Sequence, residues 1–390
     1  MDDGQRGTHQ DYVLRLASSG AIQSPAVEAA FRRVPRHRLI EAFYAGRYTE
    51  EGLVVVDPEK PTGDQQAAIY GDGALVTRVK DGRPASSSSA PALVACMLEL
   101  LELERGHAVL EIGAGTGYNA ALLAEVVGDQ RRIVSVEYQD DVAAQTQRLL
   151  RRAGYADILV VCGDGFYGYE ERAPFDRVVV TVGCPDVSPH WLAQLAPRGF
   201  VLVPLRLLIM NPLVRVWTDD DGVRGRVVGL SGFMMMEGEL YDASYWPSTP
   251  PPEHAGEGSE EPIWENFAWR PQRGEAWVDS EWGGFWYFVA TRDQRAWMPN
   301  WLGFGLRDGR GSVVISEGVI RTAGSGDLRG DLDRLHDEWH KLGRPRPSQY
   351  SLRFVAVNSA TPDVPEGAWS VDRRFFRQFT WVERRSGSST

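Results

Sequence analysis

The sequence predicts an α/β fold, a doubly wound and mostly parallel sheet, followed by a second, smaller α+β domain. Two observations support this prediction. Between residues 107 and 205, short apolar runs alternate with stretches of helical period, which is typical of parallel strands joined by crossover helices. Beyond residue 245 this alternation stops, and all but two of the 13 tryptophans, Trp191 and Trp217, lie in that second part.

The first 100 residues are expected to precede the sheet. Residues 8–47 are predicted to be helical, and residues 51–66, punctuated by prolines and glycines, to form a loop. The apolar residues of LVACMLELLEL recur at helical spacing, so residues 93–103 are predicted to form a helix, with the serines at 86–89 as its caps.

Five strands and two helices then follow in alternation. The carboxyl ends of parallel strands share one edge of a sheet, and the ligand is expected there. The predicted strands are HAVLEIG, RIVSVEY, ILVVCGDG, FDRVVVTVG and GFVLVPL, and the predicted helices are YNAALLAEVVG and DVAAQTQRLLRRAG.

The second domain is predicted from residue 276 to 384. It follows a first domain of residues 1–243 and a Pro- and Glu-rich linker of residues 244–275, and it ends at a disordered tail of residues 385–390. The segment DLRGDLDRLHDEWHKLG carries one apolar stripe and is predicted to be a helix, with His336 and His340 on a solvated face. The predicted strands are FWYFVA, SVVISEGVIRT, YSLRFVAV and FTWVERR.

Composition limits the classes of protein that are possible. A hydrophobic content of 43% and a charged content of 24% over 390 residues are typical of a soluble globular protein. Three scattered cysteines suit neither a disulfide framework nor a zinc site, and we expect no metal. The polar start and the absence of a long apolar run predict a cytoplasmic protein without a membrane partner. The net charge of −11 argues against a nucleic-acid partner.

The strongest chemical signal is VLEIGAGTGYNA, residues 109–120. Gly113, Gly115 and Gly117 lie between a strand and a helix, where glycine lets the chain turn tightly and a ligand approach the backbone. Such glycines also occur in dinucleotide folds. The GAGTG spacing and the preceding Glu111 favour S-adenosylmethionine as the cofactor. Glu111, the three glycines and Thr116 are predicted to contact it.

Two acids at later strand ends extend this cofactor site. Glu137 closes the second strand, where a carboxylate can accept hydrogen bonds from both ribose hydroxyls. Asp164 and Gly165 follow the third strand and suit a contact with the adenine edge, although such a pair can also form a simple turn. The three motifs reinforce one another because each follows a strand.

Over residues 25–240 the chain resembles protein-L-isoaspartate O-methyltransferases. The resemblance is carried by FRRVPRHRLI, SSSAPALVACMLELLEL, the glycine motif and the long stretch from GDGFYGYEERAPFDRVVV to GFVLVPL. It implies that Ser89 lies at the substrate carboxylate as the catalytic serine, and that Ser88 contacts the cofactor. An ordinary helix cap in a serine run is the competing interpretation of Ser89.

Four departures separate this chain from the family's pattern. Ala92 replaces the histidine that follows the serine–proline motif, and serines replace the threonine and isoleucine before Ser89. The closing strand is GFMMMEG, and the Trp-rich domain lies outside the common enzyme. These departures leave methyl transfer intact and put the ordinary repair substrate in doubt.

Carboxyl methylation needs few acid–base residues. An aspartate or isoaspartate carboxylate is ionised at pH 7, so no base has to remove a proton, and positioning is most of the task. The methyl ester is a good acyl donor, and attack by the next backbone nitrogen closes a succinimide. The resemblance to family variants with an added C-terminal domain implies that this ring is installed in a ribosomally made, modified peptide.

Two other hypotheses remain open. The chain can be a general repair enzyme for isoaspartyl proteins, with a merely structural second domain, or a binding protein on a decayed methyltransferase fold. The intact motifs argue against decay. Tryptophans of the second domain are expected either to fill its core, as predicted for Trp339, or to line a peptide groove that includes Trp297, Trp301 and the GGFWYF segment.

Overall fold

The computed structural model describes residues 9–208, 211–241, 258–265, 267, 279–300, 303–360 and 363–383. The predicted tail, most of the predicted linker and Trp301 lie outside these residues. The chain forms two compact units that interleave along the sequence. Unit 1 is Met1–Val182, Ser188–Leu202 and Met234–Glu239, and unit 2 is Gly183–Val187, Val203–Phe233 and Leu240–Thr390. Within the described residues, no helix is both long and apolar enough to cross a bilayer.

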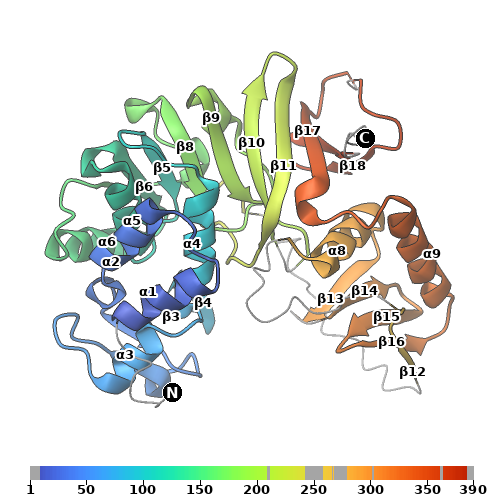
Figure 1. The fold of residues 1–390 in the computed structure, drawn as a ribbon, viewed down its shortest axis with the longest axis horizontal. Helices are drawn as coiled ribbons and strands as arrows, with labels where there is room; N and C mark the ends of the chain where they lie inside the picture. Colours follow the sequence, from blue (N-terminus) through green and yellow to red (C-terminus); the bar gives the residue numbers. More distant parts are fainter. Residues whose placement is uncertain are drawn as a thin grey trace. The chain divides into compact units, whose positions relative to one another are not determined.

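Unit 1 contains the predicted parallel sheet, in the order β9-β8-β5-β6-β7 (Figure 1). The strands are β5 Val109–Ile112, β6 Ile133–Glu137, β7 Leu159–Cys162, β8 Phe175–Val180 and β9 Leu195–Pro204. Strand order reverses at β5, whose neighbours are β6 and β8. Ligands of doubly wound sheets bind at this switch point, beyond the carboxyl ends of the strands.

The crossover helices follow the predicted segments. They are α5 Tyr118–Val127 and α6 Asp140–Arg152, with the short α7 Pro189–Ala193 before β9. In α6, aspartates occupy the first turn and arginines the last, which complements the helix dipole. Most of α5 is buried, because it packs against the N-terminal helices as well as against the sheet (Figure 1).

The N-terminal part of unit 1 differs from the prediction in three places. Within residues 8–47, helical structure ends at residue 39, and the predicted loop of residues 51–66 contains strand β2 and the start of helix α3. The serines at 86–88 belong to a β-hairpin rather than to a helix cap. An Asp-Gly turn, Asp81–Gly82 with positive φ at both residues, closes this hairpin, and this strong hairpin signal was overlooked. The elements are α1 His9–Ser18, α2 Pro25–Arg33, β1 Ala42–Tyr44, β2 Leu53–Val55, α3 Gly63–Ile69, β3 Leu75–Lys80, β4 Arg83–Ser88 and α4 Pro91–Leu100.

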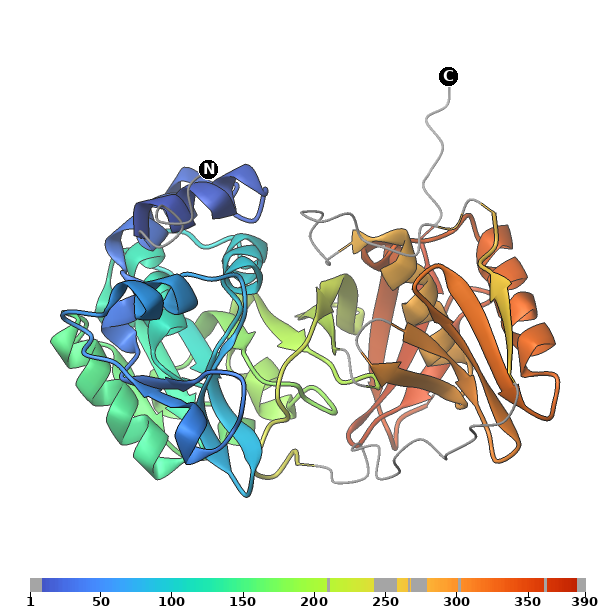
Figure 2. The ribbon, with the colours of Figure 1, turned by 90° about the horizontal axis from the view of Figure 1, so that it is seen from below.

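Unit 2 contains two sets of antiparallel strands and two helices. One set has the order β18-β19-β17-β11-β10 and the other β12-β16-β15-β14-β13. Figure 2 shows α9 (Leu328–Lys341) alongside β14 and β15. The strands are β10 Asn211–Asp219, β11 Gly222–Ser231, β12 Ser259–Pro262, β13 Ala296–Asn300, β14 Gly303–Arg307, β15 Gly311–Ser316, β16 Val319–Gly324, β17 Tyr350–Ala356, β18 Trp369–Asp372 and β19 Phe376–Val382.

The segment FWYFVA was predicted to be a strand, and this was wrong: it lies in helix α8, Glu281–Arg292. Ser280 caps the helix by accepting a hydrogen bond from the Gly283 amide at 3.0 Å. A helix buried nearly all round shows a continuous apolar run, which periodicity cannot distinguish from a buried strand. Since Phe285–Phe288 are buried, this segment does not line a groove either.

The C-terminal helix corrects one further prediction. Trp339 is fully buried, as expected, but His336 is not on a solvated face. Its ring stacks on Trp264 with centroids 4.0 Å apart, and only 13% of its side chain is exposed. The apolar stripe of α9 is therefore wider than the leucine positions alone indicate, because an imidazole can pack flat against an aromatic ring.

Candidate functional site

The glycine motif forms a loop between β5 and α5 at the switch point of the sheet. Gly113, Gly115 and Gly117 have φ of 97°, 53° and 80°, in the left-handed region that side chains disfavour. A Cβ on Gly113 would lie 2.6 Å from Thr181 Oγ1, and one on Gly117 would lie 2.9 Å from Leu150. Glycine is required here by both conformation and space, so the loop backbone is closely enclosed by β8 and α6.

Hydroxyl groups from neighbouring elements hold this loop in place. Thr181, which follows β8, lies with its Oγ1 2.7 Å from the carbonyl oxygen of Gly113 and 2.9 Å from that of Ile112, and donates to this pair. Thr146 of α6 lies 2.5 Å from the carbonyl oxygen of Gly115. The carbonyl oxygens of Gly113 and Gly115 therefore both accept hydrogen bonds from threonine hydroxyls. Thr116, the non-glycine residue of the motif, is 8% exposed.

Glu137 lies at the carboxyl end of β6, beside the glycine loop. Its Oε2 accepts a hydrogen bond from the Gly115 amide at 3.0 Å, and its Oε1 accepts one from the Gln139 amide at 3.2 Å. Burial raises the pKa of this carboxyl, and the two amides act in the opposite direction. The carboxylate therefore joins two of the predicted strand-end motifs and retains lone pairs for further donors.

Glu111 lies within β5 and is fully buried. Its Oε1 accepts a hydrogen bond from Asn119 Nδ2 at 2.8 Å, and its Oε2 accepts one from the Ser135 hydroxyl. Burial raises its pKa to about 7, although both hydrogen bonds lower it. The described contacts of Glu111 join β5 to α5 and β6, so it supports the glycine loop from beneath.

Asp164 and Gly165 follow β7 in a turn that a second segment covers. The carboxylate of Asp164 accepts hydrogen bonds from the amides of Phe166 at 2.9 Å and Glu239 at 2.7 Å. A Cβ on Gly165 would lie 2.5 Å from Ile112 Cγ2 and 3.3 Å from Met236 Cε. The segment GFMMMEG, which differs from the family's pattern, thus places Met236 against Gly165, one of the residues predicted to contact the adenine.

Ser88 and Ser89 end the β3–β4 hairpin and are held by a buried arginine. Arg36 is 0% exposed and donates to the carbonyl oxygens of Ser88 at 3.1 Å, Ser89 at 2.9 Å and Ile69 at 2.8 Å, and to Ser88 Oγ at 3.2 Å. No carboxylate among the described residues pairs with it. Burying a charge without a partner of opposite sign is costly, and the hydrogen bonds to these oxygens offset part of that cost. The same hydrogen bonds hold the backbone of Ser88 and Ser89 in one position.

The hairpin also brings the serines to the glycine loop. A Cβ on Gly115 would lie 3.1 Å from the carbonyl oxygen of Ser87, and Gln139 Nε2 donates to the Ala85 carbonyl at 2.9 Å. Ser89 itself is half-buried, and Ala92 is exposed in the first turn of α4. The structure therefore gathers the glycine motif, Glu137 and the serine segment at one edge of the unit 1 sheet.

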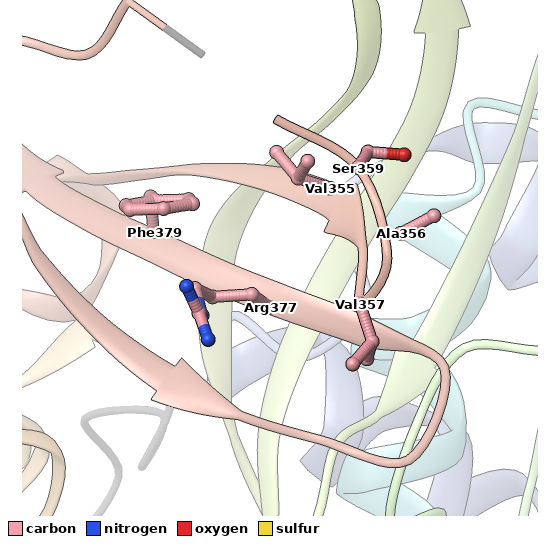
Figure 3. A pocket seen from close by; sticks show the side chains of 6 residues that line it. All are labelled: Val355, Ala356, Val357, Ser359, Arg377 and Phe379. Atoms are coloured by element: carbon pink, nitrogen blue, oxygen red, sulfur yellow. The ribbon is translucent and has the colours of Figure 1, made fainter. Parts of the chain in front are cut away.

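Two hollows lie away from this edge. One, of about 130 Å³, is lined by residues of α6, of the turn that follows it and of the amino end of β7. The other lies over β17 and β19 in unit 2 (Figure 3), and its volume of about 10 Å³ holds roughly one water molecule. Neither is large enough, or suitably placed, to take a cofactor at the motifs. The residues lining the second are Val355, Ala356, Val357, Ser359, Arg377 and Phe379.

Comparison with known proteins identifies the class of this site. The family model of protein-L-isoaspartate(D-aspartate) O-methyltransferase matches residues 7–228, more than half of the chain. The chain belongs to this family. It is therefore an enzyme whose cofactor is S-adenosylmethionine, as the motifs predicted, and whose fold is that of a class I methyltransferase.

Individual relatives carry the same name. The protein-L-isoaspartate O-methyltransferase of Methanopyrus kandleri is 36% identical over 236 residues, 60% of this chain and 93% of the relative. That of Thermotoga maritima is 36% identical over 184 residues, 47% of this chain, and the chain spans about half, 51%, of that relative's length. A solved structure titled protein-L-isoaspartate O-methyltransferase is 25% identical with a TM-score of 0.52.

That solved structure covers 88% of this chain, and 96% of its own chain is covered. A likeness of this extent must continue well past residue 228, where the family match ends. Much of the C-terminal region therefore has a counterpart in a solved protein of this name. The expectation that the added region sets this chain apart from enzymes named for isoaspartate is weakened accordingly.

Sequence reasoning missed several residues of this edge. Arg36 was quoted within FRRVPRHRLI but given no role, and Thr181 and Gln139 were not considered. No local pattern singles out Arg36, because it stands among other basic residues in RRVPRHR. No pattern in the sequence pairs Thr181 with Gly113, since the contact joins residues 68 positions apart.

Proposed function

We propose that the enzyme methylates the side-chain carboxylate of an aspartate in a ribosomally made, modified peptide, and that the ester then closes to a succinimide. This proposal refines the family's activity. The observation that carries it is the fixed Ser88–Ser89 segment beside the glycine loop, combined with an exposed Ala92 where the family has histidine. We place the acceptor carboxylate at Ser89, because one hydroxyl donor can orient it.

The proposed cofactor contacts are the residues gathered at the sheet edge. Glu137 is assigned to the ribose hydroxyls, Asp164 and Gly165 to the adenine edge, and the glycine motif with Thr116 and Ser88 to the remainder. Glu111 is assigned a supporting role, because its carboxylate is satisfied by Asn119 and Ser135. When bound, S-adenosylmethionine would supply an electrophilic methyl group, which the acceptor oxygen would take as the carbon–sulfur bond breaks.

The chain's own residues supply position rather than proton transfer. The acceptor carboxylate is already ionised at neutral pH, so Ser89 has only to orient it. Arg36 holds the carbonyls on both sides of the Ser88–Ser89 peptide bond, which limits the rotation of the serine backbone. Succinimide closure then needs only the peptide nitrogen that follows the ester, and it releases methanol.

General repair of isoaspartyl proteins is the second candidate function. The observation that favours it is the 88% coverage by a solved protein-L-isoaspartate O-methyltransferase, which includes much of the C-terminal region. In this case, the second unit would not signal a dedicated peptide substrate. We therefore keep both acceptors, aspartate and isoaspartate, within the proposal's test.

The test compares two substrates with the full-length enzyme. One is an isoaspartyl hexapeptide, and the other is a cyclised precursor peptide encoded beside the gene, with normal aspartate. Mass spectrometry should show a gain of 14 Da and then a net loss of 18 Da on the precursor, as the ester forms and the succinimide closes. Rapid methylation of the hexapeptide with none of the precursor would replace our proposal with repair. Ser89→Ala should lower kcat on the accepted substrate by about 10-fold or more, with S-adenosylmethionine affinity unchanged.

A further inference from the structure

Gln139 lies two residues after the carboxyl end of β6, at the position that precedes helix α6. Its backbone amide donates to Glu137 Oε1 at 3.2 Å, so the residue lies directly beside the carboxylate proposed for the ribose hydroxyls. Its side chain does not cap the helix, although residues at this position commonly do. The carboxamide of Gln139 is therefore available for another role at the cofactor edge of unit 1.

One end of this carboxamide is bound to the β3–β4 hairpin. Gln139 Nε2 donates to the Ala85 carbonyl oxygen at 2.9 Å. A carbonyl oxygen can only accept a hydrogen bond, so this contact decides which end of the carboxamide is the NH2 group. Oε1 is then the end that needs a donor.

That oxygen is buried, and none of the described residues donates to it. A buried acceptor without a hydrogen bond is costly and uncommon in folded proteins, so it calls for a donor. The neighbouring groups on the page, the Glu137 carboxylate and the Gly115 amide that it accepts, both belong to the proposed cofactor site. All of these residues lie in unit 1.

Glu137 also leaves work for a second acceptor. Each of its carboxylate oxygens already accepts one backbone amide, from Gly115 and from Gln139, while a ribose offers two hydroxyl donors. Burial and, to a smaller extent, the charge of Glu237 raise the pKa of Glu137, so a further carboxylate at this point would be unfavourable. A neutral carboxamide supplies an acceptor without adding charge.

We infer that Gln139 is a further cofactor-binding residue, whose Oε1 accepts a hydrogen bond from one ribose hydroxyl of S-adenosylmethionine. This inference rests on the proposed function for the assignment of Glu137 to the ribose. Because Nε2 of the same side chain binds Ala85, Gln139 also joins the ribose to the hairpin that ends in the serine pair.

The competing donor is Arg78 of β3. Its Nε is buried and likewise has no partner among the described residues, and its guanidinium pairs with Asp141, two positions beyond Gln139. A bond between Arg78 and Gln139 would be a contact within the protein that does not depend on the ribose hydroxyls. The experiment therefore has to separate a contact with a hydroxyl from a contact within the protein.

Calorimetry with the full chain can separate them, using S-adenosylhomocysteine and its 2′-deoxy and 3′-deoxy analogues as ligands. The variant is Gln139→Met, which keeps the length of the side chain and removes its polar atoms. The control is Gln130→Met, just before the amino end of β6. Gln130 Nε2 also donates to a backbone carbonyl, that of Gly154 at 2.9 Å, but its Oε1 is satisfied by the Asp157 amide at 3.2 Å.

We expect Gln139→Met to raise the Kd of S-adenosylhomocysteine by about 5- to 10-fold, from the loss of one hydrogen bond to a neutral acceptor. One of the two deoxy analogues, the one that lacks the partnered hydroxyl, should change by less than about 2-fold in the same variant. The loss of the Ala85 contact affects all three ligands alike, so it cancels in this comparison. Gln130→Met should match the wild type with every ligand.

An equal rise in Kd for all three ligands would overturn the inference and favour the contact with Arg78, and an unchanged Kd for S-adenosylhomocysteine would overturn it as well. Deoxy analogues that bind the wild type as tightly as the parent would remove the ribose assignment and the inference together. A wild-type enzyme that binds S-adenosylhomocysteine but methylates neither peptide would instead overturn the proposed peptide substrate, and the calorimetric result for Gln139 would stand.

Discussion

Glu111→Gln tests how burial of the Glu111 carboxyl, next to the glycine loop, changes the free energy of unfolding with pH. The Glu111 carboxyl is fully buried, and burial raises its pKa from an ordinary value of 4.5 to about 7. The folded protein therefore holds this proton more tightly than the unfolded chain does. The stabilising contribution is complete below pH 4.5 and is lost as pH rises through 7. At about 1.4 kcal/mol per pH unit, the difference amounts to roughly 3 kcal/mol.

Glutamine carries no charge, so the variant avoids the cost of burying an ionised carboxylate at high pH and keeps both hydrogen bonds. Its amide oxygen can accept from Asn119, and its NH2 group can donate to the Ser135 hydroxyl. Relative to the wild type, the variant should be about equally stable near pH 4.5 and more stable by roughly 3 kcal/mol at pH 8. Histidines and surface acids cancel in this difference, because both proteins contain them.

Urea denaturation followed by tryptophan fluorescence at pH 5, 6, 7 and 8 measures the free energy of unfolding of both proteins. Glu51→Gln, which changes an exposed carboxylate, is the matched control and should give a difference near zero at every pH. A Glu111→Gln variant that is less stable at pH 8, or whose advantage does not grow with pH, would refute the reasoning.

Four further changes test other parts of the fold and site. Glu137→Gln should weaken S-adenosylmethionine binding by about 10- to 100-fold in calorimetry, because a charged acceptor becomes a neutral one with a single carbonyl; unchanged affinity would exclude the ribose assignment. Gly117→Ala should lower the free energy of unfolding by at least 1–2 kcal/mol, from its φ of 80° and its approach to Leu150. Arg36→Met should cost about 3 kcal/mol or more in urea denaturation, because three buried carbonyls lose their donor. Gly284→Ala should cost about 1–3 kcal/mol and leave cofactor affinity intact, because its Cβ would strike a backbone carbonyl within unit 2; a neutral result would argue against the close packing of α8.

The sequence alone identified the parallel sheet, because that part of the chain obeys local rules. Each strand is a short apolar run and each crossover helix has helical periodicity, so each element can be predicted from its own residues. The glycine motif, Glu137 and Asp164 were found for the same reason: each lies at the carboxyl end of its strand or within two residues of it. Comparison with relatives confirmed the family and the cofactor, while the role of each site residue stays a prediction.

Local rules failed where long-range packing decides. FWYFVA shows no alternation, and it forms part of a helix that is buried on nearly every side, where periodicity carries no signal. The serine run was assigned to a helix cap because the serines carry no strand pattern of their own. They form a strand only by pairing with β3, on the other side of the Asp81–Gly82 turn.

Tertiary structure also decided the setting of the site. It revealed the buried Arg36 behind Ser89, and the contact of Gln139 with Ala85, 54 residues earlier. The first of these contacts holds the predicted catalytic serine, and the second joins the turn after β6 to the β3–β4 hairpin. Contacts between residues so far apart depend on chain closure and on the burial of charge, and neither leaves a periodic pattern in the sequence.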